Sequence, residues 1–383
     1  MTKFLKEYKF PLIGFAVWRT SLFLIAFAAT LVIPKWGGWF PYSERVLSIT
    51  GLPSWVWGFG NFDGVHYLKI AQNGYTAMFS EAFFPLYPLL IKFFNFLPKN
   101  PGLDKVVFVD PSYFLTGLFL SNLFFLAGLI LFYALIKKQF SQKIARTVII
   151  LLLIFPTSFY FGSIYTESLF FLLSTIFLFS LVKKKYLLAS LFLGLVSAVK
   201  VIGILWLVVF VINLFKAKKI GKLFLYLPIC FSGLISYMFF LGKKVGDPLF
   251  FLTAQPMFGA ERSAKPFVLL PQVFFRYIKI FLSVDPNSLS FFVAFIEILA
   301  VIGALALLIS SFKKIKFSYW FFSLLVILLP TLTGTFSSMP RYVLSAFLLL
   351  PALTIKSQKI VRVVFIGLSI ILVSLFTRGY WVS

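Results

Sequence analysis

Acidic and basic side chains are rare in this 383-residue chain, and the most informative of them stand in the segment FDGVHYLKIA at residues 62–71. Apolar side chains recur there at the spacing of one helical face, at Val65, Leu68 and Ala71. Asp63 stands just before this pattern and Gly74 just after it, as helix starts and stops do. The segment therefore predicts a short helix on a membrane surface, beginning at Asp63.

Asp63 supports two interpretations, which are compatible with each other. Its carboxylate can cap the helix by accepting from free backbone N–H groups. At a membrane edge it can also act as a general base that takes a proton from an attacking hydroxyl. His66, three residues on, shares a face with Asp63 and would orient it or bind substrate, although a plain interfacial histidine fits as well.

Two further segments carry candidate substrate-binding residues. AFFPLYP at 82–88 contains Tyr87 between two prolines, which by themselves fit a helix opening or a fixed turn. YTES at 165–168 places Glu167 at the start of an apolar helix, where its carboxylate would either interact with the helix dipole or bind sugar hydroxyls.

Several charged residues stand where a membrane protein does not favour them. Lys200 and Arg341 lie toward the outer side, against the positive-inside rule, so they are candidates to bind a phosphate, with snorkelling to lipid phosphates as the alternative. Arg19 and Glu297 lie inside apolar spans, where a charge must face protein or water. Arg19 is a further candidate cavity residue, and Glu297 receives no role.

The elements that must position these residues are membrane helices. The chain is 61% hydrophobic with a mean hydropathy of +0.99, and apolar runs recur along its length. This predicts an all-α, polytopic fold with residues 1–383 as one membrane domain. About eleven transmembrane helices are expected, at 10–33, 112–136, 144–161, 164–182, 186–199, 201–215, 222–242, 289–311, 317–333, 340–355 and 360–377.

The net charge of +25 does not indicate nucleic-acid binding, because Lys and Arg stand in short clusters between apolar runs. The positive-inside rule explains these clusters if the N-terminus is cytoplasmic. The lone cysteine, Cys230, is expected to pack in the interior, and one cysteine excludes an internal disulfide. The first apolar run has no cleavage site after it, so we expect a retained span.

This topology leaves two long outer loops, 34–111 and 243–288, and nearly all the acids lie on the outer side. The apolar segment 83–97 is too short to span and is expected to be a re-entrant or interfacial helix of the first loop. The spans 186–199 and 201–215 would each rise only roughly 21 Å against a core of about 30 Å. Their connecting turn, near Lys200 and Gly203, should therefore be recessed beside a cavity that opens outward.

The motif series at 63–66, 82–88 and 165–168 resembles that of the class V mannosyltransferases of glycosylphosphatidylinositol (GPI) anchor synthesis, the GPI mannosyltransferase 2-like family, and their bacterial relatives. The resemblance implies the C-type fold of polytopic glycosyltransferases (GT-C), with Asp63 as the catalytic base and a polyprenyl- or dolichyl-phosphate sugar as donor. The sequence departs from the family pattern at Phe62, where a Trp is expected, and at 199–203, where Lys200 replaces an arginine. No family motif matches the second loop.

The expected function is thus inverting transfer of a hexose, expected to be mannose, to an acceptor hydroxyl on a lipid or glycan at the outer face of the cell membrane. No cofactor is expected, and the need for a divalent metal is left open. Lys200 and Arg341 would stabilise the leaving phosphate. The main alternative is a transporter or flippase for an anionic lipid-linked substrate, and a noncatalytic scaffold is the third.

Overall fold

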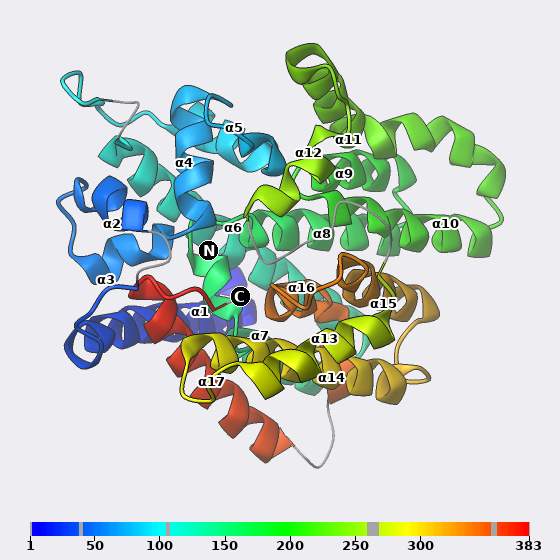
Figure 1. The fold of residues 1–383 in the computed structure, drawn as a ribbon. Coiled ribbons are helices and arrows are strands. Elements are labelled where there is room, and N and C mark those ends of the chain that lie inside the picture. The colour runs from blue at the N-terminus through cyan, green and yellow to red at the C-terminus, as the bar shows by residue number, and fades with distance from the viewer. Residues whose placement is uncertain (1, 38–40, 105–107, 259–267, 354–357, 383) are drawn as a thin grey trace.

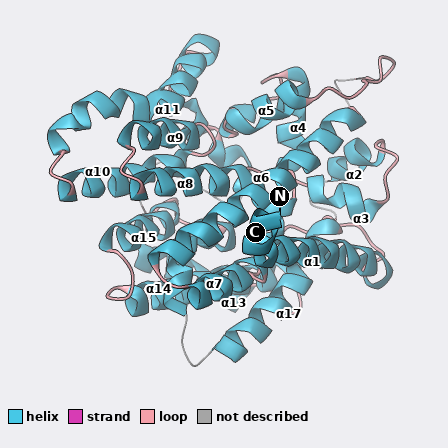
Figure 2. Cartoon of the chain, turned by 180° about the vertical axis from the view of Figure 1, so that it is seen from behind, coloured by secondary structure: helices cyan, strands magenta, loops and turns pink. Residues whose placement is uncertain are grey.

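The computed structural model describes residues 2–37, 41–104, 108–258, 268–353 and 358–382. Within these ranges the chain consists of helices and loops, with no strand (Figures 1 and 2). Parts of the predicted outer loops, at 38–40, 105–107 and 259–267, lie outside the described residues. Each of the eleven predicted spans overlaps helical backbone, which confirms the all-α, polytopic fold class.

Among the residues that the structure describes, five helices are long and apolar enough to cross a bilayer. They are α1 (Thr2–Val32), α6 (Pro111–Gln139), α11 (Leu223–Val245), α14 (Leu289–Ser311) and α17 (Gln358–Thr377). Their exposed surface is largely apolar, as contact with lipid requires.

Shorter apolar helices complete the core. They are α8 (Glu167–Val182), α9 (Tyr186–Ser197), α10 (Trp206–Lys216) and α15 (Phe317–Thr331), with the 3₁₀ turn η4 (Val201–Leu205) before α10. Two predicted spans are interrupted. The span 144–161 consists of α7 (Gln142–Leu153) and η3 (Ser158–Gly162), because Pro156 stops the helix between them, and 340–355 consists of α16 (Met339–Ser345) and η7 (Phe347–Leu353), which contains Pro351.

The two long loops are themselves helical. The first contains α2 (Pro41–Ser48), α3 (Ser54–Trp57), η1 (Gly58–Gly60), α4 (Asp63–Asn73), η2 (Ser80–Ala82) and α5 (Leu86–Phe94). The second contains α12 (Phe250–Thr253), η6 (Gln255–Phe258) and α13 (Leu270–Ser283). The segment expected at 83–97 is the short helix α5, which packs against α4 and α6 (Figure 1). The sequence interpretation missed α13.

Contacts between helix ends sort the molecule into two faces. At one face Lys137, at the end of α6, pairs with Glu7 near the start of α1. At the opposite face the end of α17 meets the segment after α1, where Arg378 Nε donates to the Ile33 carbonyl over 2.8 Å. The second face is the one that the predicted topology places outside, and it carries α4. The orientation of these faces in a membrane stays a prediction.

The turn between α9 and α10 is held deep against α5. The Leu86 backbone N–H, at the start of α5, donates to the Ala198 carbonyl over 3.1 Å. A Cβ on Gly203 would stand 2.4 Å from the Val196 carbonyl oxygen, so only glycine lets the turn fold back this closely. Helix α4, α5 and this turn therefore meet at one place.

Helices α9 and α11 also pack through small residues. A Cβ on Gly233 would lie 2.1 Å from the Gly194 carbonyl oxygen and 2.8 Å from the Ala198 methyl carbon. Close backbone approach through such residues is typical of helix pairs in membranes.

We expect Gly233→Ala to lower the thermal midpoint of the purified protein, because its methyl group overpacks this contact at a cost of about 1–3 kcal/mol. The matched control is Gly303→Ala in α14, where an added Cβ meets nothing within 4 Å. Better helix propensity should leave that variant unchanged or up to about 1 kcal/mol more stable. Equal stability of the two variants in a thermal unfolding assay would contradict the packing described.

Candidate active site

Asp63 begins α4 after a strained turn. Phe62 has φ 56° and ψ −117°, a conformation that a bulky residue rarely adopts. The turn is anchored from both sides, because Asn61 donates to the Phe376 carbonyl over 2.8 Å and its own carbonyl accepts from the Tyr165 hydroxyl over 3.0 Å. Such strain costs on the order of 1–3 kcal/mol and persists where surrounding contacts enforce it. The start of α4, and with it Asp63, is thereby fixed.

Arg341 reaches Asp63 from the other end of the chain. Its Nη1 donates to Asp63 Oδ2 over 2.7 Å, and its Nε donates to Glu167 Oε1 over 3.1 Å. The guanidinium carbon also lies 5.0 Å and 5.1 Å from the ring centres of Tyr160 and Tyr165. Two carboxylates and two aromatic rings therefore fix the position of this cation.

Lys200 joins the same network from the recessed turn. Its Nζ donates to Glu167 Oε1 over 2.5 Å, so one carboxylate oxygen accepts from both cations. Glu167 is the first residue of α8, and its side chain is 2% exposed. Glu167 does not line the cavity, and its described contacts are those of a counter-ion of Lys200 and Arg341. Its role in binding sugar hydroxyls stays a prediction.

These four residues form what we call the charged wall: Asp63, Glu167, Lys200 and Arg341. Their formal charges cancel, which lets the group exist beside a bilayer. Asp63 is its more accessible acid, with a side chain 21% exposed. A ligand entering from the cavity would meet Asp63 and the two cations before Glu167.

The charged wall borders a cavity of about 940 Å³. Asp63, Lys200 and Arg341 line it together with residues of α4, the α9–α10 turn, α13, α14 and α16. A cavity of this size accommodates a sugar and part of a lipid headgroup. The predicted convergence of Asp63, Lys200 and Arg341 on one recess is therefore present in the structure.

His66 lines the same cavity on the next turn of α4. Its ring stacks on Phe83 at 4.8 Å between centres with an interplanar angle of 14°, and Phe258 packs edge-on against it at 5.1 Å. Burial lowers the pKa of His66 below the usual 6.5, although the nearby Asp63 carboxylate opposes this shift. The neutral imidazole is therefore the form that the folded site favours.

Arg19 and Tyr87, two predicted substrate-binding residues, do not line the cavity. The Arg19 guanidinium lies over the rings of Phe23 and Phe59, at 4.0 Å and 4.4 Å from their centres. The Tyr87 hydroxyl hydrogen-bonds the Ser121 hydroxyl over 2.6 Å and is fully buried. The side chains of both residues pack between helices, and their spacing in the sequence could not show this.

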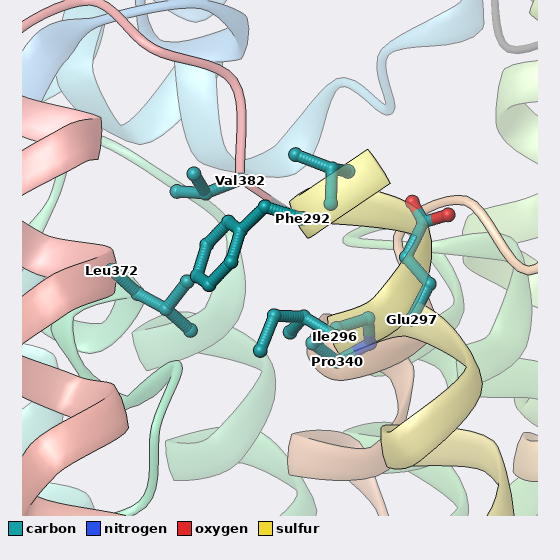
Figure 3. A pocket seen from close by; sticks show the side chains of 7 residues that line it. Phe292, Ile296, Glu297, Pro340, Leu372 and Val382 are labelled. Carbon is teal, nitrogen blue, oxygen red and sulfur yellow. The ribbon is translucent and has the colours of Figure 1, made fainter. Parts of the chain in front are cut away.

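The cavity has a second polar side that the sequence interpretation did not assign. Tyr277 and Arg276 of α13 and Glu297 of α14 line it. In Figure 3 the Glu297 carboxylate points away from the apolar group formed by Phe292, Leu372 and Val382. The amphipathic pattern of residues 270–283 was the available signal for α13.

Metal binding has no visible basis in the described ranges, because no three His, Cys, Asp or Glu side chains there stand close enough to hold an ion.

Residues 48–228 match the family model for mannosyltransferase (PIG-V). Over these residues the chain is similar to the PIG-V mannosyltransferases. The match, over somewhat less than half of the chain, includes Asp63, Glu167 and Lys200 and ends before Arg341. Comparison with curated proteins gave no match. The match confirms the family resemblance drawn from the motifs and supports a membrane mannosyltransferase, and hence a glycosyltransferase, as the function class.

Removing the shared counter-ion should strongly destabilise the protein. In Glu167→Gln, the two largely buried cations Lys200 and Arg341 would have only Asp63 as a counter-ion, which should lower the free energy of unfolding by about 3–5 kcal/mol. The control is Glu7→Gln, which breaks the Lys137 pair, where both side chains are more than a third exposed. We expect a change within about 1 kcal/mol there. Equal effects of the two substitutions on thermal unfolding would contradict the network.

His66 predicts a dependence of stability on pH. Its pKa is lower in the folded than in the unfolded chain, so the unfolded state binds more protons as the pH falls below about 6.5. Stability should therefore decrease from pH 7 to pH 5.5. Since the chain has one histidine, His66→Phe should flatten this decrease while keeping the stack on Phe83. Parallel melting profiles of wild type and variant would argue against this assignment.

Proposed function

We propose that this chain transfers a mannosyl residue from a polyprenyl-phosphate-linked donor to an acceptor hydroxyl, at the outer face of the cell membrane and with inversion of the anomeric centre. The observation that carries this proposal is the charged wall, which presents a carboxylate and two cations to a single cavity. A lipid-phosphate donor needs these groups and an opening beside the bilayer, and it needs no nucleotide-binding domain.

The proposed reaction is a single displacement. The acceptor oxygen attacks the anomeric carbon, its proton passes to Asp63, and the bond from that carbon to the phosphate oxygen breaks. The polyprenyl phosphate leaves with the electron pair, and Lys200 and Arg341 stabilise its charge. Attack opposite the leaving group inverts the anomeric centre.

The ion pair between Asp63 and Arg341 makes donor binding the first step of the proposed reaction. While Arg341 Nη1 donates to Asp63 Oδ2, the guanidinium occupies the carboxylate oxygen that would otherwise accept from the attacking hydroxyl. A donor phosphate competes for the same guanidinium and releases Asp63 toward the acceptor. Glu167 stays behind as the anchor of both cations, so the base would become active only with donor present.

Two observations support the location of the cavity at the outer face of the membrane. The basic clusters Lys183–Lys185 and Lys216–Lys222 lie at the ends of helices opposite the cavity, where the positive-inside rule predicts the cytoplasm. In that orientation, the recessed turn at Lys200 supports a charged wall that lies within reach of a lipid headgroup of the outer leaflet.

We expect Asp63→Asn to lower the rate of mannosyl transfer by about 10²–10⁴, the usual contribution of a general base. The assay is purified protein with a radiolabelled polyprenyl phosphate mannose and a panel of glycolipid acceptors. Asp247→Asn, in the second loop and outside the cavity lining, is the control and should keep wild-type activity. Transfer that survives in Asp63→Asn would remove Asp63 as the base, and donor binding without turnover under any acceptor would favour transport.

A further inference from the structure

The side of the cavity away from α4 carries a second set of polar residues, which we call the polar wall: Arg276, Tyr277, Glu297 and Thr335. All four line the cavity, and Tyr277 and Glu297 are 3% and 5% exposed. Glu297 lies eight residues into α14 from its outer end at Leu289, which is about 12 Å along the helix axis. A carboxylate at that depth is costly unless it is partnered, and its retention favours a function.

Glu297 is held in a defined orientation by Tyr277. The Tyr277 hydroxyl donates to Glu297 Oε2 over 2.5 Å and accepts from the Phe336 backbone N–H over 3.0 Å. Burial and the adjacent Glu297 raise the pKa of Tyr277, so the phenol stays protonated and remains the donor.

The loop at 334–338 connects the polar wall to the charged wall. Arg276 Nη1 donates to the Gly334 carbonyl over 3.0 Å. Gly334 has φ +88°, and a Cβ there would stand 2.6 Å from the same nitrogen, so this position requires glycine. The loop ends at Ser338, at φ 64°, where α16 begins and presents Arg341. One short segment therefore fixes both walls.

The chemistry of the two walls differs. The charged wall offers the Asp63 carboxylate and two cations, whereas the polar wall offers one carboxylate, one guanidinium and the hydroxyls of Tyr277 and Thr335, with Ser337 and Ser338 beside it. Carboxylates accept from hydroxyls, and Ser and Thr hydroxyls both donate and accept. An uncharged polyhydroxyl group fits this combination better than an anion does.

The exposed apolar face of α13 indicates that the polyhydroxyl group is the headgroup of a lipid. Phe275, Ile278 and Leu282 are 55%, 51% and 84% exposed, while Tyr277 on the opposite face points to the cavity. An amphipathic helix of this kind lies in the membrane interface with its apolar face toward lipid. A lipid-linked sugar could therefore place its headgroup in the cavity while its chains remain in the bilayer.

We propose that the polar wall is the acceptor subsite, in which Glu297, oriented by Tyr277, binds the hydroxyls of an uncharged sugar headgroup on a glycolipid. This inference rests on the proposed function, since it takes the charged wall as the donor-phosphate subsite. Glu297 accepts from the sugar hydroxyls, Tyr277 orients its carboxylate, and Arg276 and Gly334 hold the loop that joins the acceptor to Arg341.

The test compares two probes on the full chain in lipid nanodiscs, prepared without sugar detergents that would compete. Octyl α-mannoside stands in for the acceptor, and farnesyl phosphate stands in for the leaving phosphate. We expect Glu297→Gln to weaken octyl mannoside binding at least tenfold and to leave farnesyl phosphate binding within twofold. Lys200→Met should do the reverse. Tyr277→Phe should weaken the mannoside alone, by a smaller factor.

The inference would be overturned if wild type did not bind octyl mannoside, or if Glu297→Gln bound it with unchanged affinity. It would also be overturned if Glu297→Gln lost affinity for both probes equally, because Glu297 would then only dock α13 onto α14. If Glu297→Gln does not fold, Tyr277→Phe decides by the same criterion. Failure of the proposed donor site has a different signature, in which Lys200→Met leaves farnesyl phosphate binding intact while the mannoside still depends on Glu297.

Discussion

The Glu167 carboxylate accepts from Lys200 and Arg341 through a single oxygen, in a setting that excludes most water. Charges in such a setting attract each other strongly, and each would be costly without its partner. The arrangement forces three segments to converge, namely the start of α8, the turn after α9 and the start of α16. Asp63 joins them through Arg341, so the geometry of the candidate site depends on this shared counter-ion.

Local backbone strain serves the same arrangement. Phe62 and Ser338 both have positive φ, and each stands just before a helix that presents a member of the charged wall. The anchors of these turns lie far away in the sequence, as in the hydrogen bond from Asn61 to the Phe376 carbonyl. The helices of the membrane core therefore stabilise conformations that the short segments would not adopt alone, which keeps Asp63 and Arg341 in place before any substrate binds.

The sequence predicts those features that depend on neighbouring residues. Asp63 begins α4 and Gly74 ends it, Glu167 begins α8, and Lys200 lies in the turn between two short helices, because helix starts, stops and lengths are local properties. The direction of a side chain around a long helix is not local in this way. Arg19 and Tyr87 therefore pack between helices instead of lining the cavity, and the pairing of Asp63 with Arg341, 278 residues away, had no sequence signal beyond two charges on one side.

In the proposed reaction Arg341 exchanges Asp63 for a donor phosphate, and one binding measurement tests this exchange most directly. The affinity of the purified protein for a polyprenyl phosphate is compared between wild type and Asp63→Asn at matched lipid composition and salt. Because Asp63→Asn removes the carboxylate that competes with the phosphate for the Arg341 guanidinium, we expect the variant to bind the phosphate more tightly and to lose transfer. Weaker binding by the variant would contradict it, since Asp63 would then help to hold the donor.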